Sequence, residues 1–547
     1  MSTSHPNAPH TAAKSSALSR LRKMVGSPFV PVVLLLAAVV MVAVVWSDDD
    51  RGARQQQHLR TMMYAGIALI GVFSWFVVFS PFRSSVRRRI LFTGLAVVTA
   101  LSACFRIEGV DGDLLPIVRW RLAARPDRVI EPIKVVPKVA TKDQNKSDID
   151  TPSSPIAGTE SEQDFPQFLG KNRNGKLSER ALQHDWAAHP PRLLWERPIG
   201  AAWSAFSVAG QRAVTQEQRG ESELVVCYDL TTGNPLWSHA DQTRYDTTIA
   251  GIGPRASPTI AGGAVYTLGA TGILNCLDLV TGQRRWRVDT LADTQAPLLD
   301  WGMAGSPLVE GDLVIINTGG KLATLAAYDR ATGQRRWTSG SESTSYASPT
   351  IHTMLGQRQI VMQNQFTVTG HAIEDGKLLW SHPAPGAHPK VAQPVALGSD
   401  RLLISSGYGT GSDAFELTRD EAGRVTTRSL WKNVYLKAKF ANIIEHEGFL
   451  YGLNDGTLVC LEAATGQRQW RGERYGHGQL LLIGEVLLIQ AESGEVVLVE
   501  AKPGEFKELS RFTAFTEKTW NSPALSGRLL LVRNDRMAAC FELPVRE

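Results

Sequence analysis

The chemistry that cysteine can do in this chain depends on the spacing of its five cysteines. The five cysteines lie far apart, and no two form the Cys-x-x-Cys pair that is typical of zinc and dithiol redox sites. Four of them share one position, two residues before an acidic residue: Cys227, Cys276, Cys460 and Cys540. Free cysteine packs as a small apolar side chain, so the shared position predicts buried structural cysteines.

The histidines and the basic residues indicate neither a metal site nor a nucleic-acid-binding surface. His371, His382 and His388 are irregularly spaced, so they show no metal-ligand pattern. The net charge of +5 is small for 547 residues, and the repeats described below hold no basic cluster of the kind that binds nucleic acid. We therefore expect no metal site and no nucleic-acid partner.

One unit recurs from Trp203 onward, roughly every 35 to 50 residues. It opens on a small residue followed by proline and a β-run, as at Ser257-Pro258 and Ser306-Pro307. A glycine turn, a second β-run and a third β-run that ends in an acidic residue follow. A tight turn then leads into a tryptophan. Repeated units of four β-runs predict the blades of a β-propeller.

The turn into the tryptophan has the pattern Asp-x-x-Thr-Gly-x-x-x-Trp. Aspartate can accept hydrogen bonds from the backbone of a turn, and glycine adopts the positive φ that the turn requires. The tryptophan is expected to lie between neighbouring sheets, where it buries about 150–250 Å². We predict a structural role for these residues: Asp229, Gly233, Trp237, Asp278, Gly282, Trp286, Asp329, Gly333, Trp337, Glu462, Gly466 and Trp470.

The ends of the repeat region complement each other. The last unit, 520–543, stops before its tryptophan-bearing strand, whereas a lone β-run at 193–199, with Trp195, precedes the first unit. Pairing the two would close the ring and remove exposed sheet edges. The sequence therefore predicts an all-β, eight-bladed propeller over 164–547, with a composite closing blade.

Three apolar runs precede the propeller, at 28–46, 62–82 and 90–105. A membrane-spanning helix needs about 20 apolar residues, so the first two runs are long enough and the third is marginal. We expect a cytoplasmic tail at 1–27 and a membrane region with two to three helices at 28–105. The segment 101–104 resembles a lipoprotein cleavage box, which makes a lipid on Cys104 an alternative anchor.

Charge predicts the orientation of these helices, because cytoplasmic loops carry the excess of Lys and Arg. Basic residues precede the first run and separate the second from the third: Lys14, Arg20, Arg22, Lys23, Arg83, Arg87, Arg88 and Arg89. Asp48, Asp49 and Asp50 follow the first run. This predicts an inner-membrane protein with a cytoplasmic N-terminus and a periplasmic propeller. The polar stretch 106–163 is expected to be an extracytoplasmic linker.

The repeats resemble those of the quinoprotein alcohol dehydrogenase-like (PQQ-like) β-propeller family, over about 70% of the chain. The lead-in at 164–175, which begins Asp164-Phe-Pro-Gln-Phe168, is similar to that of many bacterial PQQ-like repeat proteins. Some members are dehydrogenases that hold pyrroloquinoline quinone (PQQ), and others, such as the BamB-like lipoproteins, are non-enzymatic. The resemblance suggests a membrane-anchored bacterial member.

In the dehydrogenases, the resemblance implies a mouth with calcium, a catalytic aspartate and often a disulfide of adjacent cysteines. Calcium takes six to eight oxygen ligands. The position two residues before the recurring serine should mark one end of each innermost strand: Trp203, Arg255, Ala304, Tyr346, Val391, Phe440, Gly476 and Trp520. None is a carboxylate, no Cys-Cys pair exists, and Asp246, Asp300 and Glu445 occupy unrelated registers. We expect no catalytic residues and no cofactor, with PQQ and calcium as the alternative.

Aromatic and cationic residues dominate the same position. The predicted binding residues at the channel mouth are Trp203, Arg255, Tyr346, Phe440, Trp520 and His477. Such a mouth could stack a planar ligand, grip a sugar or clamp an extended peptide, or its rings could simply plug the channel. The sequence favours a non-catalytic binding or scaffold module for protein, peptide or glycan partners. The alternative is a PQQ-dependent membrane quinoprotein oxidoreductase.

Overall fold

The computed structural model describes residues 25–47, 54–133, 161–178, 181–320 and 323–546. The chain forms two compact units, Met1–Ala123 and Ala124–Glu547. The basic residues from Lys14 to Lys23 and the aspartates 48–50, on which part of the predicted orientation depends, lie outside the described residues.

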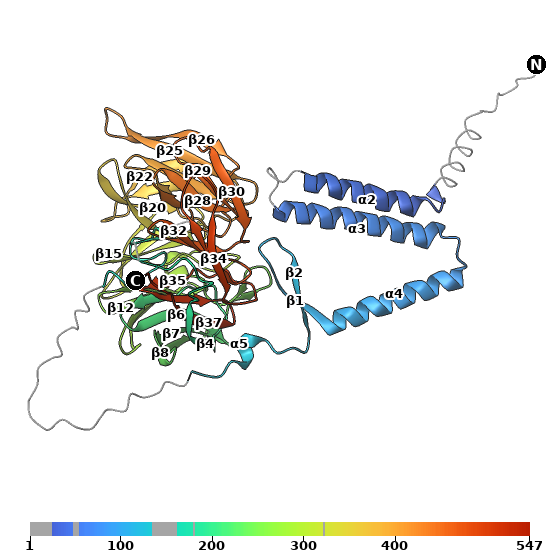
Figure 1. Cartoon of the computed structure of the whole chain (residues 1–547), viewed down its shortest axis with the longest axis horizontal. Coiled ribbons are helices and arrows are strands. Elements are labelled where there is room, and N and C mark those ends of the chain that lie inside the picture. Colours follow the sequence, from blue (N-terminus) through green and yellow to red (C-terminus); the bar gives the residue numbers. More distant parts are fainter. Residues whose placement is uncertain (1–24, 48–53, 134–160, 179–180, 321–322, 547) are drawn as a thin grey trace, which may run out of the picture. The chain divides into compact units, whose positions relative to one another are not determined.

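Three helices and a hairpin make up the first unit. Helices α2 (Val30–Ser47) and α3 (Arg54–Phe79) lie side by side, and both are long and apolar enough to cross a membrane (Figure 1). Helix α4 (Ser84–Cys104) holds the third apolar run but carries three arginines at 87–89 near its start, and it does not meet that criterion. Strands β1 (Phe105–Val110) and β2 (Pro116–Trp120) then pair as an antiparallel hairpin.

The range expected to be a linker contains regular structure where it is described. It includes the β1–β2 hairpin in the first unit and the short helix α5 (Pro126–Val129) in the second. Residues 134–160 of this range lie outside the described part of the chain.

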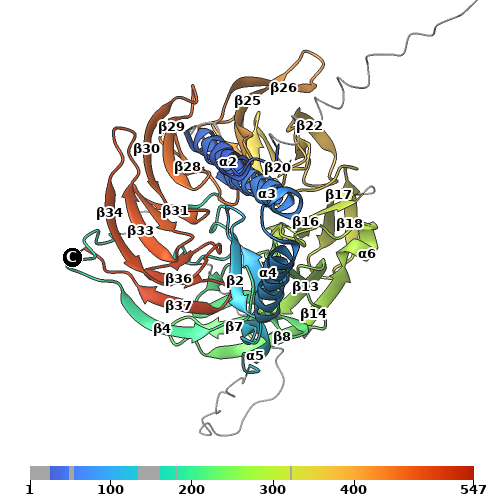
Figure 2. The ribbon, with the colours of Figure 1, turned by 90° about the vertical axis from the view of Figure 1, so that its right-hand side faces the viewer.

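Eight sheets follow one another in chain order around a central axis and form the second unit (Figure 2). The first four blades are β5 (Ser207–Ala209), β6 (Arg212–Arg219), β7 (Ser222–Asp229) and β8 (Pro235–Asp241); β11 (Thr259–Ala261), β12 (Ala264–Leu268), β13 (Ile273–Asp278) and β14 (Arg284–Asp289); β15 (Leu308–Glu310), β16 (Leu313–Gly320), β17 (Ala323–Asp329) and β18 (Arg335–Ser339); and β19 (Thr350–Met354), β20 (Gln357–Gln363), β21 (Thr367–His371) and β22 (Leu378–Pro383). A short pair, β9 (Asp246–Thr247) and β10 (Gly251–Ile252), and helix α6 (Thr290–Thr294) lie in loops between blades.

The remaining blades complete the ring as predicted. They are β23 (Val395–Ala396), β24 (Arg401–Ser406), β25 (Gly411–Arg419) and β26 (Val425–Asn433); β27 (Ile444–His446), β28 (Phe449–Asn454), β29 (Thr457–Glu462) and β30 (Arg468–Arg474); β31 (Gln479–Ile483), β32 (Val486–Gln490), β33 (Glu495–Glu500) and β34 (Glu508–Thr513); and β35 (Ala524–Ser526), β36 (Leu529–Arg533) and β37 (Met537–Glu542) with β4 (Arg192–Pro198). The closing strand β4 pairs antiparallel with β37 and sets Trp195 opposite Cys540. The eight-bladed fold and its composite closing blade are confirmed.

The repeated turn is built by the predicted hydrogen bonds. Asp229 Oδ1 accepts from the backbone N–H groups of Thr231 and Thr232 at 3.1 and 2.9 Å, and Asp278 and Asp329 repeat this arrangement. Gly233 has a φ of 68°, a conformation that L side chains rarely adopt. Each turn therefore reverses the chain tightly between the third and fourth strands of its blade.

The tryptophan of one blade lies on the turn glycine of the next. Trp237 covers Gly282, where an added Cβ would lie 2.5 Å from the indole. The indole Nε1 also donates to a backbone carbonyl of the next blade, at 3.0 Å from Trp237 to Leu279. The same contact recurs from Trp195, Trp286, Trp337, Trp431 and Trp470. The turn glycine and the tryptophan thus join blades as well as strands.

The apolar core lies in the spaces between blades. The four repeated cysteines are buried directly opposite a tryptophan, as Cys227 is opposite Trp237. Burial raises the pKa of the Cys227 thiol to about 12. They are therefore structural side chains, as predicted.

Candidate functional site

A belt of hydrogen bonds around the channel fixes the height of the mouth residues. The side chain of the recurring serine accepts from the backbone N–H of its counterpart in the preceding blade. Ser257 donates to Ser306 Oγ and Ser306 donates to Ser348 Oγ, both at 2.9 Å. The belt resumes where Gln393 N donates to Asn442 Oδ1, also at 2.9 Å. Because the belt aligns the blades, residues two positions earlier meet at one end of the channel.

Five aromatic rings gather at that end, and we call them the aromatic mouth: Trp203, Trp301, Tyr346, Phe440 and Trp520. They form a continuous chain of contacts. The ring centroids are 4.9 Å apart for Trp203–Trp520, 5.3 Å for Trp520–Phe440, 5.8 Å for Phe440–Trp301 and 4.9 Å for Trp301–Tyr346. Blades 3 and 6 are three apart in the ring, so the Trp301–Phe440 contact crosses the channel. Each ring nevertheless keeps part of its surface exposed.

Polar partners hold these rings in place. The indole of Trp203 donates to Ala250 O at 2.8 Å, and that of Trp520 donates to Glu492 Oε1 at 2.7 Å. The other oxygen of Glu492 accepts from the backbone N–H of His477 at 2.8 Å. The buried His477 ring lies 5.3 Å from that of Phe440, so His477 lies directly beside the mouth.

Arg255 belongs to the loop that supports the mouth. Its guanidinium donates to the carbonyls of Gly253, Ala250 and Gly251 and lies 4.5 Å from the centre of the Tyr245 ring. Burial lowers the pKa of Arg255 to about 10. Its donors are directed at the backbone of its own loop, unlike those of an arginine aimed at a ligand.

Trp301 and Lys518 were not among the residues predicted from the sequence. Trp301 lies three residues before Ala304, which holds the aligned position in its blade, so a register-based search passes over it. The small side chain of Ala304 was the available signal, because it leaves space for a neighbour. Lys518 Nζ lies 4.8 and 4.1 Å from the ring centres of Trp203 and Trp520, a cation–π arrangement.

The contacting ring pairs of the mouth leave no space between them for a planar cofactor. A planar cofactor between two rings needs about 7 Å between them, two contact distances of about 3.5 Å. The rings of the aromatic mouth contact each other at 4.9–5.8 Å. Among the described residues, the one group of three His, Cys or acidic side chains close enough to share a metal is His446, Glu447 and Glu485, at the β27–β28 and β31–β32 turns.

The three acids nearest to the mouth in the sequence have separate roles. Asp246 accepts from Arg125 at 3.1 Å and from Arg244 at 3.0 Å. Asp300 is exposed, and its backbone carbonyl accepts from the Tyr245 hydroxyl. Glu445 pairs with Lys176 at 2.7 Å, near the end of an innermost strand.

The Asp246 pair belongs to a docking site for the segment around α5. Buried Asp127 binds Arg244 at 2.7 Å, and its carbonyl accepts from Gly220 N at 2.8 Å. Arg128 pairs with Glu221 at 2.8 Å. These contacts fasten the start of the second unit to the β6–β7 turn of blade 1.

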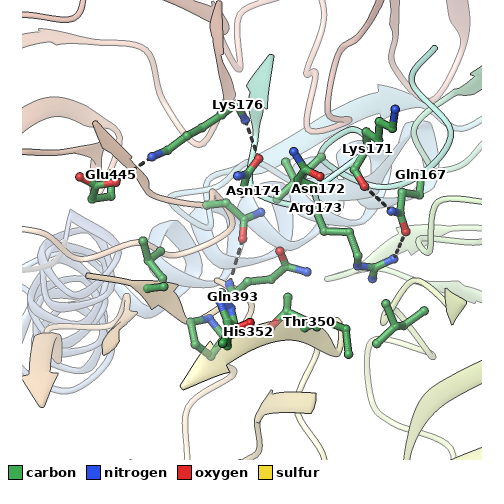
Figure 3. Close-up of a pocket in the computed structure, with 18 of the residues that line it drawn as sticks. Gln167, Lys171, Asn172, Arg173, Asn174, Lys176, Thr350, His352, Gln393 and Glu445 are labelled. Carbon is green, nitrogen blue, oxygen red and sulfur yellow. Dashed lines mark hydrogen bonds and ion pairs between the residues drawn. The ribbon is translucent and has the colours of Figure 1, made fainter. Parts of the chain in front are cut away.

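The lead-in segment closes the other end of the channel. Phe165 bridges to Val208, and β3 (Lys176–Leu177) pairs parallel with β31. Between them Arg173 is buried and donates to the carbonyls of Ser306 and Pro307 at 3.0 and 2.9 Å. A cavity of about 440 Å³ lies under this loop (Figure 3).

Comparisons with known proteins place the repeats in a family. The family model described as outer membrane protein assembly factor BamB matches residues 221–472. The quinohemoprotein alcohol dehydrogenase ADH-IIG of Pseudomonas putida is 30% identical over 124 residues, which is 22% of this chain and 17% of that protein. The chain therefore matches less than a fifth of that dehydrogenase.

Solved structures share the fold at low identity. The structure of ADHIIG from Pseudomonas putida HK5 has a TM-score of 0.52 at 12% identity, covering 71% of this chain and 81% of that one. BamB from Moraxella catarrhalis has a TM-score of 0.48 at 14% identity, covering 64% of this chain and all of that one. The matched repeats, the repeated turns and the composite closing blade together support a PQQ-like β-propeller family for the second unit.

Proposed function

We propose that this chain is a membrane-anchored binding module whose propeller holds a protein partner at the aromatic mouth, without catalysis. The observation that carries the proposal is the chain of five partly exposed rings across one end of the channel. Tryptophan, tyrosine and phenylalanine are enriched at the centres of protein interfaces, where a few such side chains supply most of the binding energy.

A protein segment suits this surface better than a planar cofactor does. The Trp203 and Trp520 indoles are held by the Ala250 carbonyl and the Glu492 carboxylate, so these two rings are positioned before a partner arrives. Their exposed surfaces would accept an apolar or aromatic side chain laid across them. Lys518, above Trp203 and Trp520, adds a cation that would favour a partner with an acidic residue nearby.

We further infer that α2, α3 and α4 anchor the chain in the inner membrane, with residues 1–27 cytoplasmic and the propeller periplasmic. The arginines 83 and 87–89, between α3 and the apolar part of α4, favour the cytoplasmic side. This orientation requires α4 to cross as a third span. A reporter enzyme fused after Leu122 that is active only in the cytoplasm would contradict it.

Site-directed photocrosslinking tests the mouth. A photoreactive phenylalanine analogue replaces Phe440 in the full-length chain. Crosslinking is then carried out in membranes of the cells that produce the protein. We expect one protein to be crosslinked there, and none from the same group at Leu378, a 53% exposed position on the outer strand β22. The purified partner should bind the full-length chain, and Trp203→Ala and Trp520→Ala should each weaken binding at least tenfold.

A cofactor titration tests the alternative. PQQ and calcium are added to the full-length chain while tryptophan fluorescence and dye-linked alcohol oxidation are followed. We expect neither saturable quenching nor turnover. Calcium-dependent quenching with turnover would overturn the proposal in favour of an oxidoreductase.

A further inference from the structure

The cavity at the lead-in end of the channel has the size of a small-molecule site. Its volume of about 440 Å³ lies within the range of about 300–1,000 Å³ that ligand pockets occupy. The lead-in residues Asn172 and Asn174 line one wall, and His352 and Gln393 lie next to each other on the facing wall (Figure 3). The cavity therefore lies between a loop and the innermost strands of several blades.

The charged side chains around the cavity already have partners. Lys176 binds Glu445 at 2.7 Å, and Arg358 binds Glu310 through both of its terminal nitrogens. Arg173 donates to Gln167 Oε1 at 3.0 Å as well as to the two channel carbonyls. A charged ligand would have to compete with these partners, so the cavity favours a neutral one.

Neutral polar groups, by contrast, lack partners. The side chain of Gln393 is 4% exposed, and its Nε2 has no hydrogen-bond partner among the residues that the structure describes. The Nε2 atom of His352 is buried and equally without a described partner. A buried amide or imidazole left unpaired is costly. These two groups indicate that something else satisfies them.

His352 and Gln393 offer one hydrogen-bond acceptor and one donor. Burial lowers the pKa of His352 to about 4, so its imidazole is neutral near pH 7. A neutral imidazole has one donor nitrogen and one acceptor nitrogen, and in the tautomer with its proton on Nδ1 the acceptor is Nε2. Gln393 Nε2 is a donor. A hydroxyl group can donate to the first and accept from the second.

The repeat departs from its pattern at this place. Four blades have serine at the belt position, whereas blades 5 and 6 have the longer amides Gln393 and Asn442, and both line the cavity. Asn442 maintains the belt by accepting from Gln393 N. The belt itself needs only a hydroxyl, as Ser306 and Ser348 show. The extra length and the amide donors therefore serve the cavity rather than the fold.

We propose that this cavity binds one neutral sugar unit, either free or at the end of a glycan. Gln393 and Asn442 would supply amides to its hydroxyls, and His352 Nε2 would accept from one of them. Leu308, Ile351 and Ile443 line the cavity as well and offer apolar surface to the C–H groups of the ring. The site is separate from the aromatic mouth and does not depend on its proposed function.

Titration of the full-length chain with defined sugars tests the proposal. The chain is purified in lauryldimethylamine oxide, a detergent without a sugar headgroup. Binding of D-glucose and N-acetyl-D-glucosamine is measured by saturation-transfer NMR, with glucuronate and glucosamine as charged counterparts. We expect saturable binding of at least one neutral sugar, more tightly than either charged one. Gln393→Ser and His352→Phe should each weaken it about tenfold, the loss of one buried hydrogen bond.

Matched variants separate binding from folding. Gln393→Ser restores the residue that four other blades carry, so the fold should tolerate it. Ser257→Ala removes a belt hydroxyl that does not line the cavity, and Trp520→Ala alters the mouth; both should bind the sugar as the parent chain does. The proposal is overturned if neither neutral sugar shows saturable binding, if a charged sugar binds more tightly, or if the Gln393 and His352 variants bind unchanged.

Discussion

The two ends of the channel are made by the same eight innermost strands, yet their chemistry is opposite. At the aromatic mouth the rings contact one another, and the Trp203 and Trp520 indoles have polar partners. At the lead-in end the charges are paired, while the neutral Gln393 and His352 side chains are not. The repeated backbone therefore provides equivalent positions, and the side chains that depart from the repeat decide what each end can bind.

An arginine at each end of the channel makes the same kind of contact. Arg255 and Arg173 both donate to backbone carbonyls, and burial lowers the pKa of Arg173 to about 9. In both cases the guanidinium binds backbone carbonyls that lie outside the strands of the blades. Basic residues in the channel are therefore a poor guide to anion binding in this protein.

The largest expected effect is on the free energy of unfolding, from a variant that disrupts the contact between blades on which both ends depend. Trp237→Ala should lower the free energy of unfolding by about 3–5 kcal/mol, because it removes a buried ring between two blades. Chemical denaturation measures the change. Trp237→Phe keeps most of the apolar contact and loses the bond to Leu279, so it should cost clearly less. Equal losses for the two variants would contradict the interblade role of the ring.

The next effect separates the two ends. Trp203→Ala with Trp520→Ala should lower partner affinity at the mouth by at least about 2 kcal/mol. Sugar binding at the lead-in end should be unchanged. Gln393→Ser should lower sugar binding and leave partner affinity at the mouth unchanged. Calorimetry on the two variants side by side measures both, and loss of both activities in either variant would show that the ends are coupled.

The pH dependence of stability should have opposite signs at the two ends. On the mouth side, burial raises the pKa of Glu223 from 4.5 to about 7. Its contribution to stability is complete below pH 4.5 and is lost as pH rises to about 7, because the folded state keeps a proton that the unfolded state releases. At the lead-in end, burial lowers the pKa of His352 from 6.5 to about 4. Its contribution is present above pH 6.5 and is lost as pH falls to about 4.

Thermal unfolding across pH 4 to 8 checks both signs. Relative to the parent chain, Glu223→Gln should gain stability toward pH 8, and His352→Phe should gain it toward pH 4. The exposed Glu221 provides the control, since Glu221→Gln should follow the parent curve. Parallel curves for all three variants would contradict the assignment.

The smallest effect concerns the belt that joins the ends. Ser257→Ala removes the hydroxyl that accepts from Ala205 N at 3.3 Å, and it should cost about 1 kcal/mol. Asn442→Ser retains an acceptor for Gln393 N and should cost less. Chemical denaturation resolves the order, and a larger loss for Asn442→Ser would show that the amide has a structural role beyond the belt.

Local chemistry explains why so much of the fold could be predicted. The Asp229 turn needs only residues within four positions of each other, so its sequence pattern carries its structure. Repetition of that turn implied blades, and the leftover strand with Trp195 implied closure against β37. The aligned positions also located Trp203, Tyr346, Phe440 and Trp520 at one end of the channel, because the belt keeps every blade at the same height.

Contacts between distant segments could not be predicted in this way. Trp301 joins the mouth only because a loop outside the register folds inward beside Ala304. Asp246, an acid near the mouth in the sequence, is paired with Arg125 from a segment expected to be a linker. Neither interaction leaves a periodic signal, since each depends on a single loop conformation.

The sequence by itself determined the repeated blades, their turns, the structural cysteines and the closing strand, because each follows from local hydrogen bonding and alternating burial. Only the tertiary structure decided that the rings close one end of the channel, and that Gln393, Asn442 and His352 surround a cavity at the other. The physical reason is that a repeat fixes the backbone position of each side chain. Its burial and its hydrogen-bond partners depend on which loops cover it.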